Sequence, residues 1–190
     1  MPPIVRFTRE SVLDAAYALV RRNGANALNA RAVARELGGS TQPIFRLFSG
    51  MDALYAQIIR KADKDLCSRM AEQARVSRNE YISVCMSYLL FARDEPELFK
   101  LLFMRDRAKE GDAGREYTHE WGFPVIERSF GVDRDTAIQL YERTFFHTHG
   151  LAVCFATKYM SCMDEERMEA IITANLRAAA ASLGVHLQDV

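Results

Sequence analysis

The sequence predicts an all-α protein in which an N-terminal helix-turn-helix domain precedes a larger helical domain. Apolar residues recur at helical spacing along the chain, cap residues and glycines mark helix ends, and no segment requires a strand. With 190 residues, 49% of them hydrophobic and 26% charged, the chain is long enough to bury a sizeable core. We expect the two domains to occupy residues 1–50 and 51–190.

The first two helices are each predicted from an apolar stripe with end signals. The first is expected to start at Thr8 and to end at Asn23-Gly24. The second is expected to start at Asn29, whose side chain can cap free backbone N–H groups, and to end at Gly38-Gly39. It is short and basic.

Two further capping patterns follow directly. Ser40 is expected to cap a third helix, in which Pro43 is tolerated because the first turn has no acceptor for the missing N–H. The second and third helices, joined at residues 38–40, make a helix-turn-helix pattern. Ser49-Gly50-Met51-Asp52 matches a capping box and is expected to open a fourth helix.

The rest of the chain repeats these signals without an internal repeat. Helices are expected over 79–91, from 94 to about 107, over 116–130 with an interruption or tilt near Gly122-Phe123-Pro124, from Asp133 onward, and over about 163–183. A polar loop is expected at 109–115.

Charge is unevenly distributed, although the formal net charge is zero. Residues 1–50 contain seven arginines and three acidic residues, so they carry +4 and the remainder carries −4. A basic N-terminal segment followed by an acidic remainder fits a polyanion-binding module joined to a domain with another function. Neither a signal peptide nor the run of about 18 apolar residues needed to span a membrane is found, so we expect a cytoplasmic protein without a membrane partner.

The four cysteines do not form a metal or disulfide pattern. Cys67, Cys85, Cys154 and Cys162 contain no C-x-x-C pair, so we expect them to be reduced and mostly buried. We expect no metal and no cofactor.

Two segments carry a specific resemblance: ALNARAVARELGGS at 27–40 and PIFRLFSGMDAL at 43–54. They closely resemble the DNA-binding domain of the TetR family of bacterial regulators, over about residues 8–60. The resemblance implies a ligand-responsive homodimeric regulator, expected to be a repressor, that binds a near-palindromic operator of double-stranded DNA. The remainder resembles the family's effector-binding and dimerisation domain, in which the last two long helices pair with a partner, and residues 91–99 with His149-Gly150 are similar to one C-terminal subgroup.

The helix-turn-helix supplies the predicted DNA-binding residues. Short side chains at the start of its second helix can reach base edges, while basic and aromatic groups hold phosphates. Thr41 and Gln42 are the expected base readers, Arg46 is expected to share base and phosphate roles, and Arg31 is expected to bind phosphate. Ser40 has two open interpretations, a helix cap and a phosphate contact. The predicted set is Arg31, Ser40, Thr41, Gln42, Phe45 and Arg46.

Three positions depart from the family pattern. Phe45 stands where a tyrosine usually touches a phosphate, so we expect Phe45 mainly to pack the third helix onto the first and fourth. Met51 replaces a common lysine and Leu47 a frequent histidine. Arg9, Arg31 and Arg35 can supply the missing charge.

The predicted effector-binding residues are aromatic, soft or hydrogen-bonding side chains on helices around the interior of the second domain. They are Tyr88, Phe103, Met104, Trp121, Tyr141, Phe145, His147, His149 and Cys154. Such a set also fits a plain core. A mostly apolar cavity with few polar groups is typical of a small-molecule site, so we expect an apolar or aromatic effector.

Other function classes find less support. His147 and His149 lie two positions apart on a predicted helix, so they point to different faces and cannot bind one metal together. No Gly-rich phosphate loop or nucleophile elbow is found, and we expect no enzyme activity. The alternative is a helical protein-interaction module that does not bind DNA, which a salt-sensitive DNA-binding assay would distinguish.

Overall fold

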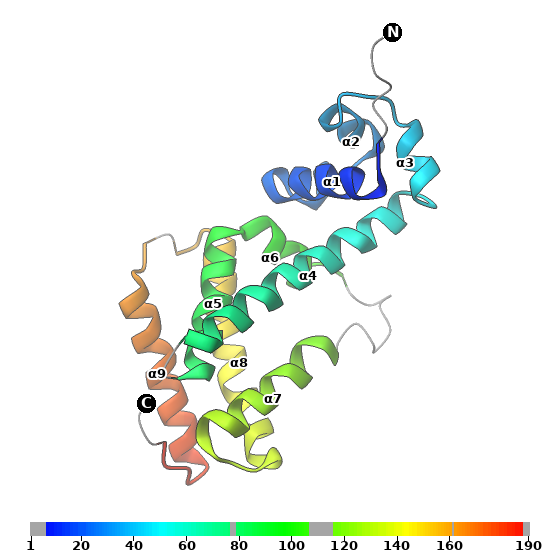
Figure 1. Ribbon diagram of the computed structural model, residues 1–190. Coiled ribbons are helices and arrows are strands. Elements are labelled where there is room, and N and C mark those ends of the chain that lie inside the picture. The colour runs from blue at the N-terminus through cyan, green and yellow to red at the C-terminus, as the bar shows by residue number, and fades with distance from the viewer. Residues whose placement is uncertain (1–6, 77–78, 107–115, 161, 188–190) are drawn as a thin grey trace. The chain divides into compact units, whose positions relative to one another are not determined.

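The computed structural model describes residues 7–76, 79–106, 116–160 and 162–187, without the side chains of 75–76 and 116–121. Over these residues the chain is all-α, which confirms the predicted fold class (Figure 1). The elements are α1 (Arg9–Asn23), η1 (Ala25–Ala27), α2 (Ala30–Glu36), α3 (Gln42–Leu47), α4 (Met51–Val76), α5 (Glu80–Asp94), α6 (Pro96–Phe103), α7 (Glu116–Phe130), α8 (Arg134–Ala156) and α9 (Glu165–Ser182). No helix among the described residues is long and apolar enough to cross a bilayer.

The chain divides into two compact units, which we call the head and the body. The head comprises Met1–Asp65 and Glu95–Arg105, and the body comprises Leu66–Asp94 and Asp106–Val190. This division follows packing and places α6 in the head. The boundary at residue 50 separates the expected DNA-binding and effector-binding functions, and it stays a prediction.

Helix α1 is the centre of the head, where it packs against α2, α3 and α6. Its start at Thr8 is confirmed by reciprocal hydrogen bonds: Ser11 N donates to Thr8 Oγ1 and Thr8 N donates to Ser11 Oγ, both at 3.0 Å. These bonds satisfy backbone donors that a helix start otherwise leaves open. The buried apolar side chains of the head include Val12, Ala16, Val20, Val33, Ile44, Phe48, Leu54, Ile58, Leu98 and Phe99.

A bidentate ion pair joins α1 to the start of α6. Arg21 Nε donates to Glu95 Oε2 at 2.6 Å, and Arg21 Nη2 donates to Glu95 Oε1. The Glu95 side chain is only 5% exposed, whereas that of Arg21 is 53% exposed. Because the carboxylate is buried, its charge requires a partner, and the arginine contributes to this compensation.

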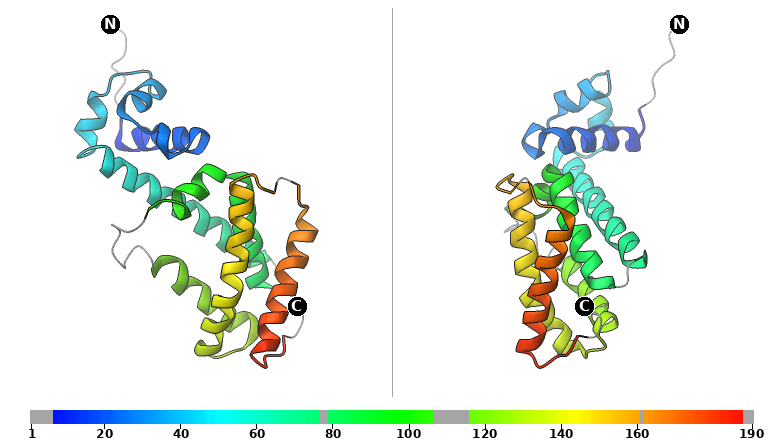
Figure 2. Two further views of the ribbon diagram at one scale, coloured as in Figure 1. Left: turned by 180° about the vertical axis from the view of Figure 1, so that it is seen from behind. Right: turned by 90° about the vertical axis from the view of Figure 1, so that its left-hand side faces the viewer.

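Helix α8 is the centre of the body. It packs against α5, α7 and α9, and α5 also contacts α7 and α9. Figures 1 and 2 show α8 (yellow) and α9 (orange to red) side by side along most of their lengths. The fully buried large side chains of the body include Leu66, Phe91, Leu89, Ile126, Leu140, Met168 and Leu176.

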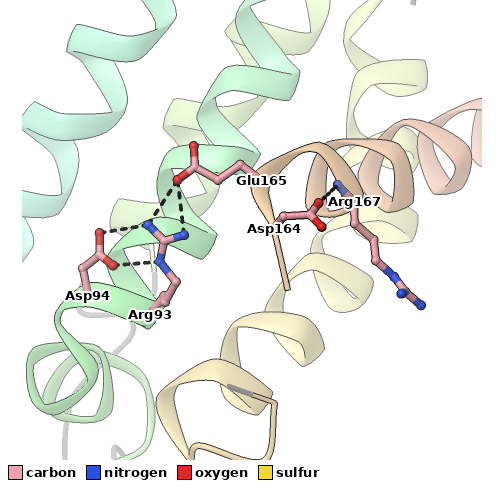
Figure 3. A network of polar contacts seen from close by, with 5 residues as sticks. All are labelled: Arg93, Asp94, Asp164, Glu165 and Arg167. Atoms are coloured by element: carbon pink, nitrogen blue, oxygen red, sulfur yellow. Dashed lines mark hydrogen bonds and ion pairs between the residues drawn. The ribbon is translucent and has the colours of Figure 1, made fainter. Parts of the chain in front are cut away.

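Acidic side chains fix the starts of the two C-terminal helices. Asp133 Oδ1 accepts from Thr136 N at 2.8 Å, which confirms the predicted start of α8. Asp164 Oδ1 accepts from Arg167 N at 2.7 Å. Next to this cap, Glu165 accepts from both terminal nitrogens of Arg93 at 3.2 Å, and thereby ties the end of α5 to the start of α9 (Figure 3).

Several element boundaries differ from those expected. Helix α3 begins at Gln42, and Thr41 occupies its cap position in a helical backbone conformation without a side-chain cap bond, so the predicted Ser40 cap is wrong. Helix α4 begins at Met51, α6 ends at Phe103, and α7 is one helix that includes Pro124. The loop expected at 109–115 lies outside the described residues.

The expectation that the cysteines are mostly buried is wrong. Cys85 is buried, Cys67 and Cys154 are partly exposed, and Cys162 is exposed. All four are free thiols. Burial raises the pKa of the Cys85 thiol to about 12, so this group is an uncharged, weakly reactive core residue.

Candidate functional site

The turn between α2 and α3 is built by local backbone hydrogen bonds. Asn29 Oδ1 accepts from Ala32 N at 2.9 Å, so the predicted cap of α2 is confirmed. At the other end, Gly39 N donates to Ala34 O at 3.0 Å and Gly38 N donates to Arg35 O at 3.1 Å. With Gly38 at φ 65°, these two bonds make a Schellman motif.

The second glycine of the turn is required by a close contact. A Cβ atom on Gly39 would lie 2.9 Å from two ring carbons of Phe7. The N-terminal segment therefore packs directly on the turn that precedes α3.

Helix α3 has one buried and one exposed face. Ile44 is fully buried, and Phe48, just after the helix, is 3% exposed. Gln42, Phe45 and Arg46 are all exposed. Their spacing of three and four residues places them together on the side of α3 that faces away from Ile44.

Phe45 does not have the packing role that its sequence position predicts. Its side chain is 56% exposed, while Ile44 and Phe48 fill the core beside it. The expectation that Phe45 packs α3 onto its neighbours is therefore wrong. Thr41 is half-buried, and Ser40, which does not cap α3, is exposed.

Arg9 contacts the C-terminal end of α3, so its guanidinium already has partners within the head. Its guanidinium donates to Leu47 O at 2.5 Å and lies 4.2 Å from the centroid of the Phe48 ring. These contacts are a charge-assisted hydrogen bond and a cation–π interaction. Arg9 therefore positions the end of α3.

Three arginines remain as exposed positive charges on α2 and α3. Arg31, Arg35 and Arg46 have no ion-pair partner among the described residues. In contrast, Arg22 on α1 pairs with Glu36 at 2.7 Å, so that its charge is compensated within the head. The head thus presents unpaired cations beside the exposed face of α3.

Four predicted effector residues lie together in the body. Tyr88 hydroxyl and His149 Nδ1 are 2.8 Å apart. The Phe145 ring stacks on both neighbours along α8, with centroid distances of 5.2 Å to Tyr141 and 5.5 Å to His149. We call Tyr88, Tyr141, Phe145 and His149 the aromatic–histidine cluster.

Burial sets the charge state of this cluster. It raises the pKa values of Tyr88 and Tyr141, so both phenols stay protonated near neutral pH. It lowers the pKa of His149, which favours the neutral imidazole. The cluster therefore combines apolar rings with uncharged hydrogen-bonding groups.

Sequence reasoning missed a hydroxyl network beside this cluster. Tyr81 hydroxyl and Thr144 Oγ1 are 2.5 Å apart, and Thr144 Oγ1 also donates to Leu140 O at 2.7 Å. Thr148 Oγ1 donates to Thr144 O at 3.0 Å. The spacing of Tyr141, Thr144, Phe145 and Thr148 was the available signal, because a threonine that bonds to its own helix can lie on an apolar face.

The other predicted effector residues are not part of the cluster. His147 is exposed on α8, and Cys154 further along α8 is half-buried. Phe103 and Met104 belong to the head. The side chain of Trp121 lies outside the described residues. Among the described side chains, no group of three or more histidine, cysteine, aspartate or glutamate residues has metal-binding geometry.

Comparison with known proteins finds a family match in the N-terminal part of the chain. Residues 12–58 match the family model described as bacterial regulatory proteins, tetR family. No curated protein matches the chain.

Solved structures resemble the fold over nearly the whole chain. A transcriptional regulator from Rhodococcus sp. RHA1 aligns with a TM-score of 0.71 at 16% identity, covering 93% of this chain and 97% of its own. A putative TetR-family regulator from Vibrio parahaemolyticus gives 0.58 at 22% identity, covering 90% and 97%. A TetR-family member from Streptomyces coelicolor gives 0.65 at 16% identity, covering 88% and 96%. At these identities the likeness shows a shared fold.

Proposed function

We propose that this chain is a ligand-responsive repressor, because residues 12–58 match the family model of bacterial regulatory proteins of the tetR family. Proteins of this family are DNA-binding regulators and not enzymes. In the proposed function, a homodimer binds a near-palindromic operator through α3, and a small apolar or aromatic effector releases it.

The exposed face of α3 is the observation that carries the DNA-binding proposal. Gln42 and Arg46 are the side-chain types that hydrogen-bond to adenine and guanine edges in the major groove. Arg31 and Arg35 add positive charge for phosphates, and Ile44 anchors the opposite face of the helix in the core. Exposed, unpaired cations in this arrangement fit a polyanion better than an apolar protein surface.

Selection of duplexes from a randomised pool by the full-length protein tests this proposal. We expect enrichment of a near-palindrome whose half-site centres are about 34 Å apart, one turn of DNA. Arg46→Ala should weaken binding to the selected duplex by about 1–3 kcal/mol, whereas Gln42→Ala should mainly change the preferred bases. Failure to enrich any duplex at low salt would contradict DNA binding.

Exposed surfaces of α8 and α9 support the homodimer. Phe146 on α8 is 71% exposed. The alanines of α9, whose small side chains allow close helix packing, are exposed at Ala170, Ala174, Ala178 and Ala181. Apolar groups at such positions are typical of a face that a second helix pair covers.

Sedimentation of paired variants tests the homodimer. Phe146→Lys should shift the protein toward monomer at micromolar concentration, because it places a charge in the proposed interface. Tyr159→Lys is the matched control, since Tyr159 is 83% exposed but lies after the end of α8. A wild-type monomer would contradict the proposal.

The aromatic–histidine cluster supports an aromatic effector. Stacked rings with a few neutral polar groups are the usual lining of a small-molecule site. Native mass spectrometry should show any co-purified compound, and titration of neutral aromatic compounds can be followed through the fluorescence of the single tryptophan. Phe145→Ala should weaken binding of a compound that scores in this titration by about tenfold, and His147→Ala, exposed on the same helix, should not.

In this proposal, effector and operator must each weaken the binding of the other. An effector shifts the equilibrium only through its different affinities for the DNA-binding and released states, and about a 100-fold preference corresponds to about 2.7 kcal/mol. The operator must then weaken effector binding by the same factor. Calorimetric titration with and without the selected duplex measures both affinities, and equal values would remove the proposed release mechanism while leaving DNA binding intact.

A further inference from the structure

Phe45 is an aromatic side chain without a structural task in the head. It is 56% exposed, and no ring contact or cation–π contact involves it among the described residues. The residues on either side of it in the core, Ile44 and Phe48, already fill the space between α3 and the rest of the head. Exposure of a phenyl ring to water is unfavourable, so the ring is a candidate for burial against a partner.

The neighbours of Phe45 indicate what that partner is. Gln42 precedes it by three residues and Arg46 follows it, so all three project from one side of α3. Phe45, whose ring has no hydrogen-bond donor, thus lies in the chain between two polar side chains that are proposed to read bases. Arg31 and Arg35, exposed and unpaired nearby in the chain, make the surroundings attractive to a polyanion rather than to an apolar protein surface.

A phenyl ring on such a face has one apolar target in the major groove. Base edges there offer hydrogen-bond donors and acceptors, except for the C5-methyl group of thymine. A phenyl ring has no donor for a phosphate oxygen. We infer that Phe45 is a specificity-determining residue that packs on a thymine methyl in each operator half-site; the inference rests on the proposed DNA-binding function.

The helix geometry limits where that thymine lies. Side chains three residues apart on a helix have Cβ atoms about 5–6 Å apart. Base pairs are spaced by about 3.4 Å along the duplex. The thymine read by Phe45 therefore lies one or two base pairs from the base that Gln42 contacts.

Uracil substitution removes only the methyl group and so tests this inference directly. The probe is the duplex selected by the full-length protein, in which each thymine is replaced in turn by uracil. At one thymine per half-site, wild-type affinity should fall about fourfold, or about fifteenfold when both half-sites are changed, as expected for one buried methyl group each. Uracil at other thymines should have little effect.

Variants of Phe45 connect the methyl group to this side chain. Phe45→Ala should bind the thymine and uracil duplexes with equal affinity, whereas Phe45→Leu, which keeps an apolar side chain, should retain part of the preference. Thermal unfolding of both variants checks the fold, which should be unchanged because the side chain is largely outside the core.

The possible results separate this inference from the proposed function. If no duplex is selected, DNA binding itself fails. If a duplex is selected but wild-type affinity is the same with uracil at every thymine, the thymine contact is wrong and DNA binding stands. A Phe45→Ala variant that keeps the full preference for thymine also overturns the inference, because another residue then reads the methyl group.

Discussion

The head and the body differ in the polar side chains that they bury. In the head, the buried carboxylate of Glu95 pairs with Arg21, whereas Arg22 and Glu36 form an ion pair nearer the surface. In the described part of the body, the buried polar side chains are uncharged, such as Thr144, which bonds to Tyr81. Surface ion pairs are weak and are screened by salt. A buried neutral hydrogen bond is insensitive to salt, but removal of one partner leaves a buried polar group unsatisfied and lowers the stability.

This contrast matches the two proposed ligands. A polyanion requires exposed charges that are free to exchange counterions, which Arg31, Arg35 and Arg46 provide. An aromatic effector requires a low-charge interior, which the aromatic–histidine cluster provides. Salt should therefore act mainly on the head, and loss of buried hydroxyls or a change in pH should act mainly on the body.

The largest expected effect is that of salt on operator binding. If the three unpaired arginines of each protomer contact phosphates, the dimer makes about six such contacts, and affinity should fall about 10³-fold between 50 and 200 mM salt. Arg31→Ala, at an arginine proposed to bind phosphate, should reduce the slope of log affinity against log salt by about 2 across the dimer. Fluorescence anisotropy with the selected duplex measures the slope.

The body supplies the control for this effect. Arg128 is an exposed arginine of α7 that pairs with Glu80, so Arg128→Ala should leave the slope unchanged. An equal loss of slope in both variants would show that the cations of the head have no special role.

Two arginines of α1 test how burial changes the value of an ion pair. Arg21 and Arg22 are each 53% exposed, but the carboxylate of Glu95 is 5% exposed and that of Glu36 is 32% exposed. Arg21→Ala removes a bidentate partner of a buried carboxylate and should lower the free energy of unfolding by about 1–3 kcal/mol. Arg22→Ala should cost less than about 1 kcal/mol in urea unfolding. Equal costs would remove the distinction.

The hydroxyl network of the body should give a smaller, salt-independent effect. Tyr81→Phe removes one hydrogen bond but leaves Thr144 bonded to Leu140 O, so the expected cost in unfolding free energy is about 1 kcal/mol. Tyr159→Phe, at an exposed site, is the control. A cost for Tyr81→Phe that disappears at high salt would contradict the neutral character of this network.

The smallest expected effect is the pH dependence contributed by His149. Burial lowers its pKa in the folded protein, so the unfolded chain binds more protons as pH falls through the ordinary value of 6.5. Stability therefore decreases as the pH falls below this value. The melting temperature of His149→Gln should fall less than that of the wild type between about pH 7.5 and pH 5. His147→Gln, at an exposed site, should keep the wild-type profile.

Cap signals predicted much of the fold because they act locally. Thr8, Asn29 and Asp133 each bond to the first turn of a helix as expected. Ser40 failed as a cap because the glycine turn leaves Thr41 in a helical conformation, which places the start of α3 at Gln42. A cap pattern cannot reveal the path of the preceding turn.

Phe45 shows the limit of apolar patterning in a short helix. Ile44 and Phe45 are adjacent apolar residues, and only one of them can face the core. A helix of six residues has too few turns for the spacing of its apolar residues to show which of the two faces the core. Tertiary packing selects Ile44, and that choice exposes the phenyl ring.

In the body, residue chemistry identified side chains but not their grouping. Tyr88, Tyr141, Phe145 and His149 lie together, whereas Phe103 and Met104 belong to the head. The assignment of any of them to an effector stays a prediction. Tyr81 and Thr144 were not predicted because residue type alone does not distinguish a buried hydroxyl from an exposed one, and only helical spacing placed Thr144 on an apolar face.

The turn before α3 carries a consequence for sequence divergence. Gly38 has a positive φ but open space around its Cβ position, so asparagine, which tolerates that backbone conformation, can replace it. Gly39 is restricted instead by the ring of Phe7, which would lie 2.9 Å from an added Cβ. Positions 7 and 39 should therefore covary among descendants of this protein, with a larger residue at 39 accompanied by a smaller one at 7, while position 38 varies independently of both.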